Sequence, residues 1–209
     1  MRCMLTVAFI LLAAAHTARG SDDPESFVTR LTGGIAPPLV ATQPNSHPQF
    51  RSPVFALIFP KAGAAQLVVL SRGEGEAGSV VASSRQFGYE PTANYGAAIE
   101  GLEAQSPGSF SLHVTVREGC ARGVRTHKFA IRGGIWTVVG RDASGPKCTD
   151  AGVETAWSTS ANFLTGKAER TSYANDRPAG RRTVSATRPA FSLSEFPPKE
   201  YDPDYDELQ

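Results

Sequence analysis

The sequence has few cysteines and no apolar run long enough to cross a bilayer. Three cysteines stand among 209 residues, and a chain of this length buries a core without needing cross-links. The longest apolar run, Met4–Ala15, has 12 residues, whereas a membrane-spanning helix needs roughly 20. These shortages exclude a small disulfide-stabilised fold and argue against a membrane-spanning helix.

An excess of one charge is also missing. The formal net charge is +1, and a dedicated nucleic-acid binder usually shows a clear basic excess, so we expect no nucleic-acid partner. The hydrophobic content of 41% excludes a wholly disordered chain. The 20 glycines and 15 prolines predict short elements separated by many turns.

Recognisable catalytic motifs are absent as well. No G-x-S-x-G elbow, H-E-x-x-H or P-loop occurs. Gly73–Gly78 fits G-x-G-x-x-G, but a strand-like stretch follows where a dinucleotide site needs a helix, so we interpret it as a hairpin turn. His47, His113 and His127 lack a zinc-site spacing. We therefore predict no cofactor, no metal and no catalytic residue, although a site assembled from distant residues would leave no motif.

Residues 1–20 have the features of a secretory signal peptide. Arg2 supplies a positive start, the apolar run follows, and Ala18-Arg19-Gly20 places small residues at −3 and −1 of a cleavage site before Ser21. The alternative is an uncleaved membrane anchor. The sequence predicts a periplasmic or secreted protein with no transmembrane segment after cleavage.

Two cysteines remain after cleavage, Cys120 and Cys148. Thiols in an oxidising compartment usually pair. Cys120 stands in the first turn of a predicted three-strand meander, and Cys148 follows its third strand, so both fall at one end of the sheet. We predict a disulfide between them; the alternative is a reactive thiol.

The fold prediction depends on short strands. The clearest is Ser109–Arg117, where apolar and polar residues alternate strictly. Further strands are predicted at Val54–Phe59, Gln66–Leu70, Ser79–Phe87, Val124–Arg132, Ile135–Arg141, Trp157–Phe163, Ala168–Tyr173 and Arg181–Thr187. Residues 88–108 are interpreted as a loop in which Ala97–Ala104 could be a short helix. We predict an all-β domain over residues 50–190, with antiparallel meanders forming a curved sheet, a sandwich or a partial propeller.

Two irregular ends flank the predicted domain. Residues 21–52 are interpreted as an irregular arm with one helical turn near Pro24–Leu31, and residues 191–209 as a Pro-rich, disordered acidic tail. Residues 195–209 carry six acidic side chains against Lys199, whereas residues 21–194 carry a net charge of +4. The tail is either solvated or paired with the basic body.

Basic side chains cluster in two strand-rich stretches. On a sheet they could form one positive face for an acidic protein, a glycan or a lipid head group. The candidate residues are Arg117, Arg125, Lys128, Arg132, Arg170, Arg181 and Arg182. The alternative is the ordinary polar face of a half-buried sheet.

Several stretches resemble one group of exported bacterial proteins. They are AQLVVLSRGEGEAGSVVASS, GSFSLHVTVREG, HKFAIRGGIWTVVGRD, ETAWSTSANFLTGKAERT and FPPKEYDPDYDEL. In their strand and turn patterns they resemble uncharacterised exported proteins related to FG-GAP or VCBS-type repeat proteins. The resemblance implies an all-β, periplasmic protein and no reaction. Members often carry a D-x-[DN]-x-D-G string where this chain has Pro53–Phe59, which puts the group's calcium site in doubt.

Together these features favour a non-enzymatic binding or interaction protein. Its partner is expected to be a protein or a component of the cell envelope, and one specific form is an inhibitor or immunity-type protein. One alternative is a cell-envelope hydrolase with dispersed catalytic residues, whose activity should be lost when His113 or His127 is mutated. The other alternative is a structural envelope component.

Overall fold

The computed structural model describes residues 23–42, 53–72, 78–88, 95–118, 121–149, 152–174, 177–186 and 188–197. None of the helices within these ranges has the length and apolarity that a membrane crossing requires. The Gly73–Gly78 turn falls largely outside them, because residues 73–77 are not described.

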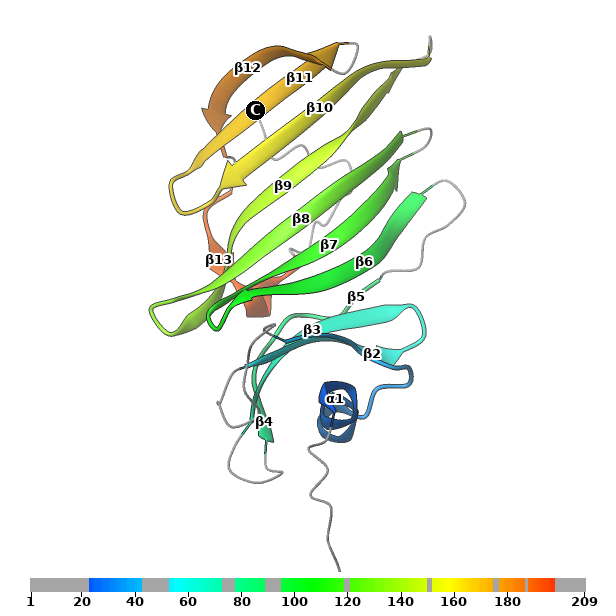
Figure 1. Ribbon diagram of the computed structural model, residues 1–209, viewed down its shortest axis with the longest axis vertical. Coiled ribbons are helices and arrows are strands. Elements are labelled where there is room, and N and C mark those ends of the chain that lie inside the picture. Colours follow the sequence, from blue (N-terminus) through cyan, green and yellow to red (C-terminus); the bar gives the residue numbers. More distant parts are fainter. Residues whose placement is uncertain are drawn as a thin grey trace, which may run out of the picture.

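Two antiparallel sheets make up most of the described chain (Figure 1). Sheet A has the order β1-β2-β3-β4, with β5 paired to β3. Its strands are β1 (Leu39–Ala41), β2 (Val54–Lys61), β3 (Ala64–Arg72), β4 (Gly78–Ser83) and β5 (Phe87–Gly88). One helix, α1 (Pro24–Thr32), precedes it.

Sheet B is a continuous meander in which each strand pairs with the next along the chain. Its strands are β6 (Tyr95–Ser106), β7 (Ser109–Glu118), β8 (Ala121–Arg132), β9 (Ile135–Thr149), β10 (Gly152–Asn162), β11 (Lys167–Ala174) and β12 (Arg177–Ser185). A short β13 (Phe191–Ser192) pairs with β9, and the 3-10 turn η1 (Leu193–Glu195) follows it.

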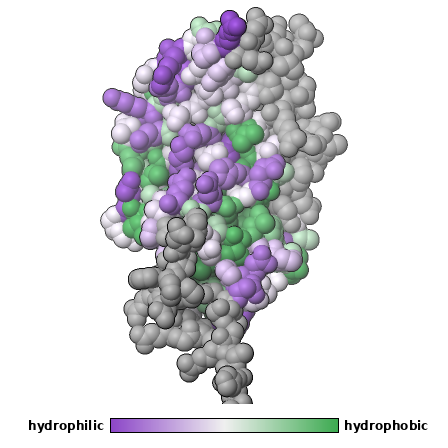
Figure 2. All heavy atoms as spheres, viewed as in Figure 1, coloured by the Kyte–Doolittle hydropathy of each residue, from purple (hydrophilic) through white to green (hydrophobic). Residues whose placement is uncertain are grey.

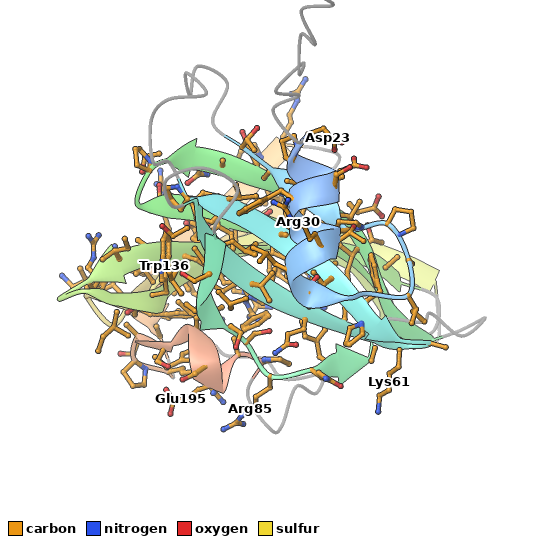
Figure 3. The ribbon with its side chains drawn as sticks, turned by 90° about the horizontal axis from the view of Figure 1, so that it is seen from below. Asp23, Arg30, Lys61, Arg85, Trp136 and Glu195 are labelled. Atoms are coloured by element: carbon orange, nitrogen blue, oxygen red, sulfur yellow. The ribbon has the colours of Figure 1, made fainter. Side chains whose placement is uncertain are left out.

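Strands β2 and β3 of sheet A are buried on both faces, which explains the continuous apolar sequence of β2. Alternate residues of β2 and β3, among them Val54, Ala56 and Leu70, contact Phe27 and Val28 of α1. Figure 3 shows α1 lying across these strands. A strand that packs on both sides has no polar face, so its residues do not alternate.

The other face of sheet A packs on sheet B and forms the main core. Phe55 of β2 stacks on Phe110 of β7 with ring centroids 4.6 Å apart, and Trp136 of β9 meets Phe55 edge-on at 5.3 Å. Phe110 in turn stacks on Phe129 of β8 at 4.5 Å. The aromatic side chains therefore join the two sheets into one core.

The segment that contains β13 and η1 closes one side of this core. Phe196 is buried and contacts Phe87 of sheet A and Phe129 of sheet B edge-on, at 5.9 and 5.2 Å. Its carbonyl oxygen accepts a hydrogen bond from the Arg85 amide at 2.8 Å. This segment thus fastens the chain to both sheets.

The all-β prediction is confirmed, and three local predictions need correction. Residues 95–106, interpreted as part of a loop with a possible short helix, form strand β6, because their backbone pairs along β7 from Tyr95 to Ser106. The segment interpreted as an irregular arm contains α1 and β1. The prediction of a disordered tail over 191–209 is wrong for residues 191–197, which form β13 and η1, because the buried side chains of Leu193 and Phe196 pack into the core. Beyond sheet A, sheet B continues through β10 to β12 toward the end of the molecule farthest from α1 (Figure 1).

Candidate functional site

Sheet B has two faces with different chemistry. We call the side that carries Phe110, Leu112 and Phe129 the core face and the opposite side the outer face. Alternation along β7 puts Ser111 and His113 on the outer face. Figure 2 shows hydrophilic side chains gathered over the middle of that face.

A row of polar residues crosses five strands on the outer face. The strand registers pair His113 with Thr126, Thr126 with Asp142, Asp142 with Ser160, and Ser160 with Glu169. Directly opposite residues in an antiparallel pair point to the same face, so these side chains are neighbours. We call this set the polar row.

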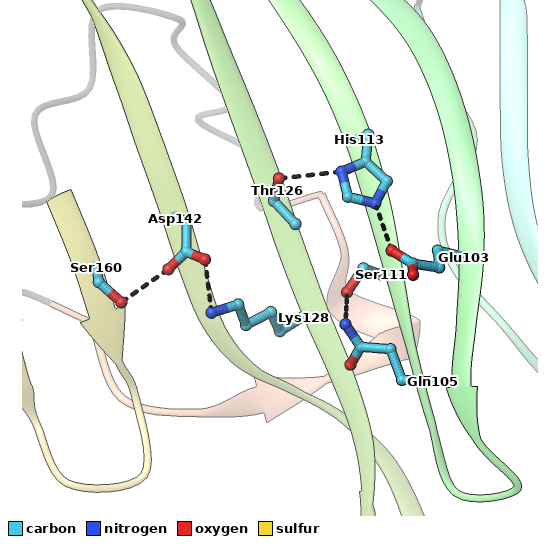
Figure 4. Close-up of polar contacts among 8 residues, drawn as sticks. All are labelled: Glu103, Gln105, Ser111, His113, Thr126, Lys128, Asp142 and Ser160. Atoms are coloured by element: carbon cyan, nitrogen blue, oxygen red, sulfur yellow. Dashed lines mark hydrogen bonds and ion pairs between the residues drawn. The ribbon is translucent and has the colours of Figure 1, made fainter. Parts of the chain in front are cut away.

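One end of the polar row joins a carboxylate, an imidazole and a hydroxyl (Figure 4). The Nε2 atom of His113 lies 3.4 Å from a carboxylate oxygen of Glu103, and its Nδ1 atom lies 3.1 Å from the Thr126 hydroxyl. The side chain of His113 is 33% exposed and that of Glu103 is 64% exposed. The arrangement has the elements of a hydroxyl activated by a base, but it lies on an open surface.

The middle of the polar row is held by an ion pair. Lys128 Nζ lies 2.6 Å from one oxygen of Asp142, and the Ser160 hydroxyl donates to the other oxygen at 2.7 Å (Figure 4). Farther along, Arg181 forms an ion pair with Glu169, and the hydrogen bond that its guanidinium donates to this carboxylate raises the pKa of Arg181. Both carboxylates of the row thus have a fixed orientation and a nearby compensating charge.

A groove of about 290 Å³ follows the row across β8 to β11. Short hydroxylated side chains and two carboxylates line much of it: Thr126, Asp142, Ser144, Ser158, Ser160, Glu169 and Thr171. Hydroxyl groups both donate and accept hydrogen bonds, so the groove suits a ligand that does the same.

The structure does not bring the predicted basic residues to one face. Lys128 and Arg181 lie on the outer face in the ion pairs described above. Arg125, Arg170 and Arg182 occupy core-face positions, because Arg125 pairs in register with Val114 and Arg170 pairs with Arg182.

Arg132 and Arg117 belong to neither group. Arg132 stands at the β8–β9 turn, is exposed, and donates to the carbonyl of Ile131 at 3.3 Å. Arg117 takes an outer-face register position on β7, and its side chain is outside the described part of the structure.

The core-face arginines form a second row where sheet B extends past sheet A. Arg125 pairs with Ala143, Ala143 with Thr159, Thr159 with Arg170, and Arg170 with Arg182. We call these five residues, one from each strand of β8 to β12, the arginine row. Among the described residues, the Thr159 hydroxyl is the one buried side-chain polar atom without a hydrogen-bond partner.

Arg141 lies next to this row and was not among the candidate residues. It pairs with His127, one position nearer the aromatic core, and is 9% exposed. A bulge in β9 causes the miss: Lys128 pairs with Gly140 and Phe129 with Val138. The extra residue shifts the alternation, so simple counting from Val138 assigns Arg141 to the wrong face.

His127 is buried between this arginine cluster and the aromatic core. It is 4% exposed, and its ring meets Phe196 edge-on at 5.1 Å. Burial, with smaller contributions from the charges of Arg141 and Arg125, lowers the pKa of His127 to about 3. The imidazole is therefore neutral in the folded protein near neutral pH.

The described part of the chain bears on metal binding but not on the predicted disulfide. Within it, no three His, Cys, Asp or Glu side chains gather as metal ligands would. Cys120 is outside the described residues, and Cys148 lies on β9 with its side chain undescribed, so the disulfide stays a prediction.

Comparisons of the chain with protein-family models, with curated proteins and with solved structures found no match. The resemblance to FG-GAP or VCBS-type proteins therefore stays a prediction. The fold and the surfaces define the structural class of this protein. It is an all-β protein of two packed sheets, and sheet B presents a polar outer face with a groove.

Proposed function

We propose that this chain is an exported, non-enzymatic binding protein whose outer-face groove binds an uncharged, hydroxyl-rich glycan of the cell envelope. The observation that carries the proposal is the groove of short hydroxylated side chains along the polar row. A glycan offers many hydroxyl groups that donate and accept, which matches Ser144, Ser158 and Thr171.

The ion pairs support an uncharged ligand. Asp142 and Glu169 present carboxylate oxygens beside the groove, and Lys128 and Arg181 compensate their charges. Such carboxylates accept hydrogen bonds from sugar hydroxyls without giving the surface a large net charge. An anionic or strongly cationic ligand would gain little from this arrangement.

Binding can be tested by calorimetric titration with a soluble N-acetylglucosamine oligomer. Replacing two groove hydroxyls together, Ser158→Ala and Thr171→Val, should weaken binding about thirty-fold, because each lost hydrogen bond costs on the order of 1 kcal/mol. Thr183→Val is the matched control, since Thr183 is on the outer face of β12 but outside the groove. Equal affinity in all three proteins, or no binding at all, would overturn the proposal.

Export rests on residues 1–20 and has its own test. Protein recovered from outside the cytoplasm should begin at Ser21 when its N-terminus is sequenced. A protein that retains residues 1–20 and stays with the membrane would support the anchor alternative.

A hydrolase is the second candidate, and the Glu103–His113–Thr126 contacts favour it. It ranks second because β8 pairs with strands on both sides, which leaves the backbone amides near Thr126 engaged in ladders and not free to stabilise an oxyanion. We expect no turnover of ester or peptidoglycan substrates. Turnover that disappears in both His113→Gln and Thr126→Val would reverse the ranking.

A further inference from the structure

We propose that the acidic segment of this chain, residues 198–209, docks on the core face of sheet B along the arginine row. The inference concerns the face opposite the groove and does not depend on the proposed function. It rests on the place where the chain leaves the described structure, on charge and on length.

The chain enters the acidic segment beside the arginine row. Phe196 and Pro197 are both buried, and the Phe196 ring touches His127. His127 pairs with Arg141 and stands two residues from Arg125 on β8. The first residues of the segment therefore start next to the β8 and β9 end of the row.

The charges are complementary. Residues 198–209 contain five acidic side chains and one basic side chain, Lys199. Glu200, Asp202, Asp204 and Asp206 stand at alternate positions, so an extended conformation places all four on one side. Guanidinium groups bind carboxylates with paired, charge-assisted hydrogen bonds, which makes arginine a suitable partner.

The lengths also agree. An extended segment from Glu200 to Asp206 spans roughly 20 Å, at about 3.3 Å per residue. The arginine row crosses from β8 to β12, which is about 19 Å at roughly 4.8 Å between neighbouring strands. Acidic side chains spaced along the segment can thus reach Arg125 at one end and Arg182 at the other.

The centre of the row is buried, whereas Arg182 at its far end is exposed. Thr159, at its centre, is only 5% exposed, and its hydroxyl is a donor without a hydrogen-bond partner among the described residues. Arg170 beside it lies over the ring of Trp157 at 5.8 Å, which holds its guanidinium against the sheet. An anionic chain crossing here meets both a hydroxyl donor and an oriented guanidinium.

The test compares full-length variants by hydrogen exchange. Asp202→Asn, Asp204→Asn and Asp206→Asn together should speed exchange of the β11 and β12 amides about ten-fold and leave those of β2 and β3 unchanged. Arg170→Gln with Arg182→Gln should have the same effect. Combining the two sets of substitutions should speed exchange no further, because each set removes the same contact between the acidic segment and the arginine row.

Controls separate docking from general weakening. Lys128→Gln with Arg132→Gln removes two basic groups elsewhere on sheet B. It should leave β11 and β12 exchange as in the wild type, and neutralising the acidic segment in this variant should still speed that exchange about ten-fold. Arg170→Lys with Arg182→Lys should restore part of the protection. Additive effects of the two sets, or no effect of neutralising the segment, would overturn the proposal. Row-dependent binding of added polyglutamate to the unmodified protein would also overturn it, since the row would then be open to an external anion.

Discussion

At the scale of single residues, His127 links stability to pH. The folded protein holds the pKa of His127 at about 3, below the ordinary value of 6.5, because the ring is buried beside Arg141 and Arg125. Between those two pH values the unfolded chain binds a proton that the folded chain does not. The folding free energy contributed by neutral His127 is therefore complete above pH 6.5 and decreases as the pH falls toward 3.

We predict that His127→Phe flattens this dependence. The wild type should lose about 2 kcal/mol of unfolding free energy between pH 7 and pH 5 from His127, at about 1.4 kcal/mol per pH unit below 6.5. The phenyl ring retains the contact with Phe196 and does not titrate. Urea unfolding at pH 7, 6 and 5 measures the difference. Val138→Ala, which truncates a buried side chain that does not titrate, is the control and should lower the unfolding free energy by the same amount at all three pH values. A slope unchanged by His127→Phe contradicts the assignment.

Also at the residue scale, the disulfide remains a prediction from the sequence. The described pairing of β8 with β9 ends at Val124 and Ser144, and Cys120 lies outside the described residues. The prediction rests on the two thiols that remain after cleavage and on the oxidising compartment that export implies.

If residues 1–20 are cleaved as predicted, we expect the remaining chain to contain no free thiol. Alkylation without a reducing agent should leave the intact mass unchanged, and alkylation after reduction should add two groups, at Cys120 and Cys148. Removing the bond with Cys148→Ser should lower the unfolding free energy by roughly 3 kcal/mol, because the closed loop restrains the unfolded chain. Two groups added without reduction would show the pairing to be wrong.

At the scale of elements, sequence patterns identified strands better than faces. The alternation of Ser109–Arg117 predicts β7 correctly, and the turn at Gly133-Gly134 separates β8 from β9 as expected. The β6 strand was missed because its glycines and alanines favour neither state, and pairing with β7 decides the outcome. Which face of sheet B Arg141 occupies depends on a bulge in β9, and no residue pattern in the sequence marks that bulge.

Helix α1 supplies the stability prediction at the scale of elements. Phe27 of α1 is 2% exposed and packs on the outward side of sheet A. Phe27→Ala should lower the unfolding free energy by about 3 kcal/mol, since it removes a large buried ring and leaves a cavity between helix and sheet. The exposed Thr29 on the same helix, replaced by Ala, should change it by less than about 0.5 kcal/mol. Chemical denaturation compares them, and equal small effects would mean that α1 is not held by this contact.

At the scale of the whole molecule, stacking of the two sheets is what the sequence least reveals. The apolar run of β2 predicts burial, but not that one side meets α1 and the other meets sheet B. Likewise, basic residues that are close in sequence lie on opposite faces of sheet B, because successive side chains along a strand point to opposite sides. The candidate groove arises only when four strands, β8 to β11, lie in register, so no local sequence motif indicates it.

The shared core predicts that both sheets unfold together. Trp136 is 8% exposed and contacts Phe55 of sheet A and Phe110 of sheet B, so its fluorescence reports on the joint between the sheets. In a Trp157→Phe background, unfolding in urea should give the same midpoint by Trp136 fluorescence and by far-ultraviolet circular dichroism. Sheet A cannot separate without exposing the aromatic face of sheet B, which makes an intermediate costly.

Phe55→Ala tests this coupling directly. It should lower the unfolding free energy by about 3 to 5 kcal/mol and move both midpoints by the same amount, because the ring belongs to a core that the two sheets share. Leu164, an exposed apolar residue in the β10–β11 turn, serves as the control, and Leu164→Ala should leave both midpoints in place. If the fluorescence change came first and half of the dichroism signal persisted to higher urea, sheet B would hold its structure without sheet A, and the two sheets would be separate cooperative units.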